Sequence, residues 1–223
     1  MSLDVIERET GAQPAASIIV MHGLGADGND FVPICDQLDL SSVGPVRFIF
    51  PHAPVRPVTI NGGHRMRAWF DVLSFDRGRD EDEQGLRESQ GEIAALIDKE
   101  IARGVPAERI VLMGFSQGCA MTLMTGLRYG QRLAGLVALS GYLPLAETVA
   151  AERSEANAEL PIFLVHGIAD PVIPLARAEA ARDVLTELGY PVEWRAYNMV
   201  HTVTPQELSD IHAFLLRVLA PAA

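Results

Sequence analysis

The chain has 223 residues, of which 48% are hydrophobic and 21% are charged, and its formal net charge is −11. This apolar share is enough for one substantial core, and we predict a single domain over residues 1–223. The acidic balance argues against nucleic-acid binding, which needs clustered Lys and Arg, and the apolar stretches are too short for a membrane span.

The cysteine content and the N-terminal residues bear on the cellular compartment. Two cysteines, Cys35 and Cys119, are too few for a disulfide framework in a domain of this size, and both fall among apolar neighbours. The first residues have neither the basic nor the apolar region of an export signal. We therefore expect buried free thiols in a reducing compartment, the cytoplasm.

Apolar runs of strand length alternate with helix-like segments along the chain. The predicted strands are residues 17–21, 46–50, 109–113, 133–139, 161–165 and 192–197, with an edge strand at 3–9. The predicted helices are residues 31–38, 86–103, 117–129, 175–188 and 205–219, and Gly104 and Gly189 are placed to end two of them. The alternation predicts an α/β fold with a mostly parallel sheet covered by helices on both faces.

Two segments break this alternation, residues 54–84 and residues 143–160. Both are too long for plain connections, so we expect them to shape a site. Neither is large enough for a separate cap domain, and the predicted site is therefore open.

The pentapeptide Gly114-Phe115-Ser116-Gln117-Gly118 lies between a predicted strand and a predicted helix. A serine on such a sharp turn has a strained backbone and an exposed hydroxyl, which requires very small neighbours at both flanking positions. We predict that Ser116 is an activated nucleophile.

The base that would activate Ser116 is predicted from its order in the chain. Hydrolases of this architecture present serine, acid and histidine in that order, on loops at the carboxyl ends of strands. Of the histidines after Ser116, His212 lies inside a predicted helix, whereas His201 follows a strand and precedes a helix start. His201 is the predicted base.

The predicted acid is Asp170, which follows the strand at 161–165 and precedes Pro171. It lies between Ser116 and His201 in the chain, as the order requires. His166 and His22 are interpreted as residues that organise their own loops.

A tetrahedral intermediate needs donors for its negative charge, usually two backbone N–H groups. We assign them to Gln117, at the start of the helix after the nucleophile, and to Leu24, in a glycine-containing loop after the first central strand. No metal-binding pattern occurs in the sequence, and we predict no metal site.

Together these motifs resemble the small carboxylesterase and acyl-protein thioesterase family of α/β-hydrolases, also called the phospholipase/carboxylesterase family. The resemblance spans nearly the whole chain. Its carriers are His22 to Asp27, Asn61 to Gly63, Arg67 to Asp71, Gly114 to Gly118, His166-Gly167, Asp170 to Pro174 and Tyr197 to His201.

The resemblance implies an α/β-hydrolase without a large lid or a cofactor, which uses the triad Ser116, Asp170 and His201 and the oxyanion donors Leu24 and Gln117. It also implies an acyl groove. The groove residues would be Trp69, Phe70, Leu73 and Val172. Aromatic residues of the groove segment are equally expected as core anchors.

The sequence departs from the family pattern at two positions. Val200 stands where glycine commonly precedes the catalytic histidine, and Arg67 stands where proline is common. Val200 would stiffen or shift the His201 loop, and Arg67 would place a charge near the groove. These departures put the substrate preference in doubt.

The leading function is a serine carboxylesterase that acts through an acyl-enzyme on short- to medium-chain esters. An acyl-protein thioesterase or a lysophospholipase shares this chemistry and stays open, as does a homodimer. A ligand-binding module without catalysis is an alternative of another class.

Overall fold

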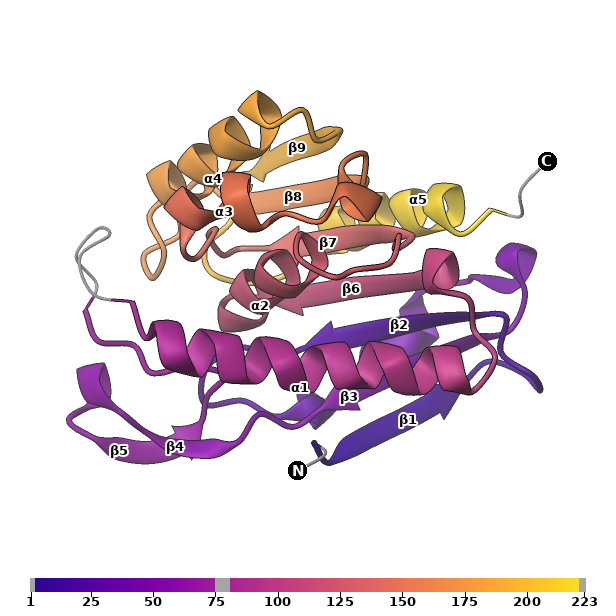
Figure 1. Cartoon of the computed structure of the whole chain (residues 1–223), viewed down its shortest axis with the longest axis horizontal. Coiled ribbons are helices and arrows are strands. Elements are labelled where there is room, and N and C mark those ends of the chain that lie inside the picture. The colour runs from indigo at the N-terminus through magenta and orange to yellow at the C-terminus, as the bar shows by residue number, and fades with distance from the viewer. Residues whose placement is uncertain (1–2, 75–80, 221–223) are drawn as a thin grey trace.

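The computed structural model describes residues 3–74 and 81–220, and a seven-stranded sheet forms its centre (Figure 1). The strands follow the spatial order β1-β3-β2-β6-β7-β8-β9, in which β1 is antiparallel to β3 and the other pairings are parallel. The strands of this sheet are β1 Val5–Glu9, β2 Ala16–Met21, β3 Val46–Pro51, β6 Ile110–Phe115, β7 Gly135–Leu139, β8 Ile162–Gly167 and β9 Val192–Tyr197. The predicted mostly parallel sheet and the predicted edge strand near the N-terminus are confirmed, whereas the antiparallel direction of that strand was not predicted.

Helices cover both faces of the sheet (Figure 1). The α-helices are α1 Glu83–Ala102, α2 Gln117–Gly126, α3 Val149–Glu152, α4 Leu175–Glu187 and α5 Pro205–Val218. Two predicted helix ends are confirmed, because Gly104 and Gly189 follow α1 and α4 with φ angles of 96° and 86°.

The two cores follow from the alternation of side chains along each buried strand. In β2, Ile19 and Met21 join one cluster, which includes apolar residues of α1, α2 and α4. Ile18 and Val20 face the other cluster, with apolar residues of α5. Because both faces are buried, these strands are continuously apolar rather than alternating.

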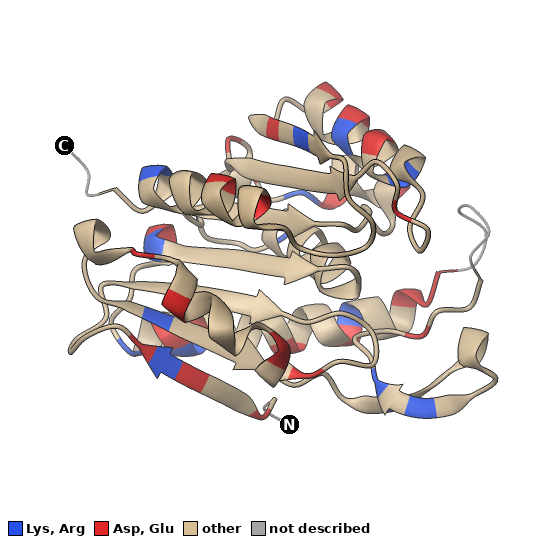
Figure 2. Ribbon diagram, turned by 180° about the vertical axis from the view of Figure 1, so that it is seen from behind, with Lys and Arg blue, Asp and Glu red and all other residues tan. Residues whose placement is uncertain are grey.

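Most charged residues lie away from this centre (Figure 2), and Arg47 on β3, which is buried, pairs with Glu100 at 2.7 Å. The ribbons of the central strands carry almost no charge, whereas α4, α5 and the edge strands β1 and β9 carry residues of both signs. A charge inside the sheet would have to be desolvated, so this distribution is the one that a two-sided core requires.

The structure differs from the sequence prediction in two places. The segment predicted as a helix at 31–38 is a 3-10 helix at Gly28–Gln37, which has Pro33 inside it and is capped by the Asp27 side chain. Within 54–84 the chain forms an antiparallel hairpin, β4 Val55–Val58 and β5 His64–Arg67, which the prediction had missed. Residues 75–80 of that segment lie outside the described residues.

The two cysteines carry free thiols, as predicted, but their burial differs. Cys119 is fully buried in α2, whereas Cys35 is only partly buried on the 3-10 helix, so the prediction that both are buried is wrong for Cys35. In the described ranges, no helix combines the length and the apolar character needed to cross a bilayer.

Candidate active site

Ser116 lies where the connections of the sheet reverse direction. After β2 the chain moves outward to β3, and it then returns to β6 on the other side of β2. In open parallel sheets such a reversal leaves a crevice at the carboxyl ends of the strands, where ligands bind. Ser116 follows the last residue of β6 directly and is therefore in that crevice.

The turn at Ser116 has the strained geometry predicted from its sequence. Ser116 has φ 57° and ψ −115°, values that an L-residue rarely adopts. A Cβ atom at Gly114 would lie 2.2 Å from the Gly118 carbonyl oxygen, and one at Gly118 would lie 2.1 Å from the Met21 carbonyl oxygen. Both glycines are therefore required by close backbone contacts.

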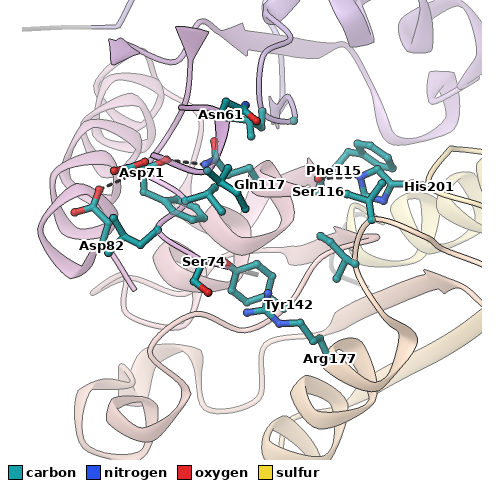
Figure 3. A pocket seen from close by; sticks show the side chains of 18 of the residues that line it. Asn61, Asp71, Ser74, Asp82, Phe115, Ser116, Gln117, Tyr142, Arg177 and His201 are labelled. Atoms are coloured by element: carbon teal, nitrogen blue, oxygen red, sulfur yellow. Dashed lines mark hydrogen bonds between the residues drawn. The ribbon is translucent and has the colours of Figure 1, made fainter. Parts of the chain in front are cut away.

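The structure brings the three predicted triad residues together, and Figure 3 shows two of them, Ser116 and His201. The Nε2 atom of His201 lies 2.9 Å from the Ser116 Oγ atom, and the Nδ1 atom lies 2.7 Å from Oδ2 of Asp170. Asp170 follows β8 and His201 follows β9. With Nδ1–H donated to Asp170, Nε2 can accept the hydroxyl proton of Ser116.

The carboxyl group of Asp170 is held ionised by its hydrogen bonds. Burial by itself would raise its pKa, but the bond from His201 and those from the backbone amides of Ile173 and Val172 outweigh it and lower the pKa. Oδ1 accepts from Val172 N at 2.8 Å and from Ile173 N at 2.9 Å. A fixed carboxylate therefore orients the imidazole of His201.

The ring of Phe115 also contacts the histidine. The Phe115 and His201 ring centroids are 4.7 Å apart, and the planes are inclined by 44°. This packing limits rotation of the imidazole about its side-chain bonds.

Two other histidines organise loops, as interpreted from the sequence. His22 accepts from the Ala53 amide through Nε2 at 3.0 Å, and its Nδ1 atom lies 2.7 Å from the Gly23 carbonyl oxygen. His166 lies 2.8 Å from the Ile173 carbonyl oxygen through Nε2. Burial lowers the pKa of both imidazoles, so both are neutral structural groups.

The residues assigned to the oxyanion hole, Leu24 and Gln117, line the same cavity as Ser116 and His201. Gln117 is the first residue of α2, where the backbone N–H has no acceptor within the helix. Within the described residues, neither amide donates to a backbone carbonyl outside regular elements.

The side chain of Gln117 has a structural role that was not predicted. It is buried, accepts from Trp69 N at 2.8 Å through Oε1, and donates to the Phe70 carbonyl oxygen at 2.7 Å through Nε2. It therefore fastens the segment of Trp69 and Phe70 to the start of α2.

The predicted acyl groove is a cavity of about 710 Å³, and three of its four predicted residues line it: Phe70, Leu73 and Val172. Trp69 does not. It is fully buried, and its Nε1–H donates to the His22 carbonyl oxygen at 2.9 Å. The assignment of Trp69 to the groove is therefore wrong, and its role is that of a core anchor.

The two departures from the family pattern leave the triad geometry intact. Val200 is exposed, and His201 next to it keeps both of its hydrogen bonds. The guanidinium of Arg67 donates to the Ala53 carbonyl oxygen at 2.9 Å, and Arg67 does not line the cavity. Arg67 therefore places no charge on the cavity wall, contrary to the prediction.

Sequence reasoning missed several polar residues of the cavity wall, among them Tyr142 and Arg177. Tyr142 could have been found, because it follows the carboxyl end of β7 by three residues. Arg177 lies in the first turn of α4, and its sequence context carries no signal of the cavity. In the part of the chain that the structure describes, no three His, Cys, Asp or Glu side chains gather as metal ligands would.

Comparison with known proteins identifies the family of this chain. Residues 3–219 match the family model described as phospholipase/carboxylesterase. The chain is 41% identical over 221 residues to acyl-protein thioesterase 1 of Neurospora crassa, with 95% of this chain and 90% of the relative covered. It is 38% identical over 219 residues to acyl-protein thioesterase 1 of Gibberella zeae, with 94% and 93% covered.

A solved structure is similar over nearly the same length. The crystal structure of Arabidopsis thaliana SOBER1 matches with a TM-score of 0.87 and 35% sequence identity, and the match covers 92% of this chain and 99% of that one. The fold described above is therefore the α/β-hydrolase fold without a large cap.

Proposed function

The chain belongs to the phospholipase/carboxylesterase family and is an ester hydrolase, and we propose that it works through an acyl-enzyme formed on Ser116. The observation that carries this proposal is the chain of hydrogen bonds from Ser116 through His201 to Asp170, at 2.9 Å and 2.7 Å.

Acylation begins when Ser116 Oγ attacks the carbonyl carbon of the substrate. His201 Nε2 takes the hydroxyl proton as the new C–O bond forms, and Asp170 stabilises the imidazolium. His201 then gives that proton to the leaving alcohol or thiol as its bond to the carbonyl carbon breaks. The acyl group remains on Ser116 as an ester.

Deacylation repeats these steps with water as the nucleophile. His201 accepts a proton from water while the oxygen attacks the acyl carbon, and the same proton returns to Ser116 Oγ as the acid leaves. The N–H groups of Leu24 and Gln117 would donate to the oxyanion in both steps, since both residues line the cavity at Ser116.

The acyl group would occupy the cavity along Phe70, Leu73 and Val172. The apolar side chains of the cavity and its volume of about 710 Å³ would accommodate short- to medium-chain acyl groups. A second candidate is deacylation of proteins or lipids. It is favoured by the curated relatives at 38–41% identity, which are acyl-protein thioesterases.

We propose that the protein is cytoplasmic, and its two free thiols support this location. The homodimer that the sequence left open stays a prediction, as does the extent of the domain over residues 1–223.

The test is a series of p-nitrophenyl esters from acetyl to lauroyl, run beside matched acyl thioesters, with Ser116→Ala as the blank. We expect a loss of roughly 10⁵-fold or more in kcat for Ser116→Ala. A maximum at short esters would support the carboxylesterase, and a preference for long-chain thioesters would support protein deacylation. Equal turnover by the wild-type protein and the blank would overturn the proposal.

A further inference from the structure

The wall of the active-site cavity carries one cation among the described residues, Arg177. Its guanidinium carbon lies 3.5 Å from the centroid of the Tyr142 ring, so the two groups are stacked. Figure 3 shows this pair in the same pocket as Ser116 and His201 and to one side of them.

The fold does not explain a cation at this position. Arg177 is in the first turn of α4, where the helix dipole disfavours positive charge. Across residues 3–74 and 81–220, no carboxylate forms an ion pair with it. Tyr142 is not its counter-ion either, because burial raises the pKa of that phenol to about 12.

The neighbouring carboxylates of the cavity already have partners in the fold. Glu81 accepts from the Leu145 amide at 2.8 Å, and Asp71 accepts from the Thr59 amide at 2.7 Å. Asp82 accepts from the Gly85 amide at 2.9 Å, as the N-cap of α1. The charge of Arg177 acts on Glu81, where it opposes the rise in pKa that burial causes, but no ion pair with a described carboxylate occupies the guanidinium.

We propose that Arg177, held flat by Tyr142, binds an anionic group of the substrate, a carboxylate or a phosphate. Stacking fixes the plane of the guanidinium and leaves its edge free to donate two parallel hydrogen bonds. This proposal rests on the proposed function, because it names a substrate class for the same cavity.

The other charged residues of the cavity restrict where a substrate anion can bind. Besides Glu81, on which the charge of Arg177 acts, three carboxylates line the cavity and repel an anion placed elsewhere in it: Asp30, Asp71 and Asp82. A substrate anion is therefore favoured only where the substrate brings it to Arg177. For an anion on the acyl chain, this predicts a preference for one chain length rather than a general preference for acids.

The experiment compares two ladders of thioesters, acyl chains that end in a carboxylate and the methyl esters of the same chains. We expect the wild-type enzyme to prefer the carboxylate at one chain length. Arg177→Gln should lower kcat/KM for that substrate by roughly 10- to 100-fold, in line with the loss of a charged hydrogen-bond pair, and leave the uncharged ladder nearly unchanged. The dicarboxylic acid of the preferred length should inhibit the wild-type enzyme and inhibit Arg177→Gln more weakly.

A third set, neutral acyl thioesters with an anionic leaving group, separates the two sources of the anion. A loss with Arg177→Gln on this set alone assigns the subsite to the leaving group and supports the proposal. Arg182→Gln is the matched control, since Arg182 lies on the same helix outside the cavity and pairs with Asp183.

The proposal is overturned if Arg177→Gln affects charged and uncharged substrates equally, or if no charged substrate is preferred at any length. Either result overturns the proposal only if the neutral thioesters are still hydrolysed in a Ser116-dependent way. The absence of that turnover would instead contradict the proposed function, so the two failures are distinguishable.

Discussion

Ser116 and the wall of the groove share one cavity, but they are held in place by different means. Around Ser116 the backbone is closely packed, so that a Cβ atom at Gly118 would lie 2.1 Å from a carbonyl oxygen. On the groove wall, Leu73 and Val172 are 39% and 48% exposed. The catalytic part therefore tolerates little change, whereas the groove can change its side chains without disturbing the core.

The largest effect is expected for Gly118→Ala. The new methyl group would force α2 away from the end of β2. We expect the free energy of unfolding to fall by at least about 3 kcal/mol and ester turnover to be lost. Thermal unfolding and a p-nitrophenyl ester assay measure both. Gly91→Ala is the control, because a Cβ atom there meets nothing within 4 Å in α1, and it should stabilise the helix by up to about 1 kcal/mol. Equal unfolding temperatures for the two variants would contradict the comparison.

The variant Asp170→Asn should fold normally but lose most of its catalytic activity. An asparagine oxygen can still accept from Val172 and Ile173, but the amide cannot stabilise the imidazolium or hold the same tautomer of His201. We expect kcat to fall about 10⁴-fold with little change in unfolding temperature. Asp183→Asn, on the exposed surface of α4, should retain full activity. A fall of less than tenfold for Asp170→Asn would remove Asp170 from the triad.

Glu207→Gln tests whether the tight packing extends to the helix after His201. Glu207 is buried in the capping box of α5, and burial raises its pKa to about 7. Below pH 4.5 the carboxyl group is protonated in the folded and the unfolded chain. Between pH 4.5 and 7 the unfolded chain loses the proton first, so the free energy of unfolding falls as the pH rises.

The Glu207→Gln variant lacks this titration. Relative to the wild-type protein, its free energy of unfolding should therefore rise by up to roughly 3 kcal/mol from pH 4.5 to 7. Urea unfolding of both proteins at several pH values measures the difference. Parallel curves for the two proteins would mean that Glu207 ionises in the fold as it does in water.

The smallest effects are expected for Leu73→Ala and Val172→Ala. Both side chains are substantially exposed, so stability should change by less than about 0.5 kcal/mol. The value of kcat/KM should fall less than tenfold, and more for long acyl chains than for acetyl, because a longer chain covers more of the apolar surface of these side chains. A uniform loss along the acyl series would mean that these residues act on the triad and not on the groove.

The same contrast decides what the sequence could predict. The grouping of Ser116, Asp170 and His201 could be predicted because strand order and chain order together prescribe where each must lie. Trp69 was misassigned because its side-chain direction depends on hydrogen bonds from other elements, such as the bond of its indole to His22. Arg177 was missed for a related reason: nothing in its local sequence records that α4 begins at the cavity.

The backbone at Ser116, with φ 57° and ψ −115°, also bears on how the protein evolves. An L-residue in such a conformation costs on the order of 1–3 kcal/mol, whereas glycine adopts it freely. A lineage released from the need for catalysis would thus gain stability from a glycine at this position. A serine at this position is the less stable choice, and it is the one that the proposed catalytic role of Ser116 requires.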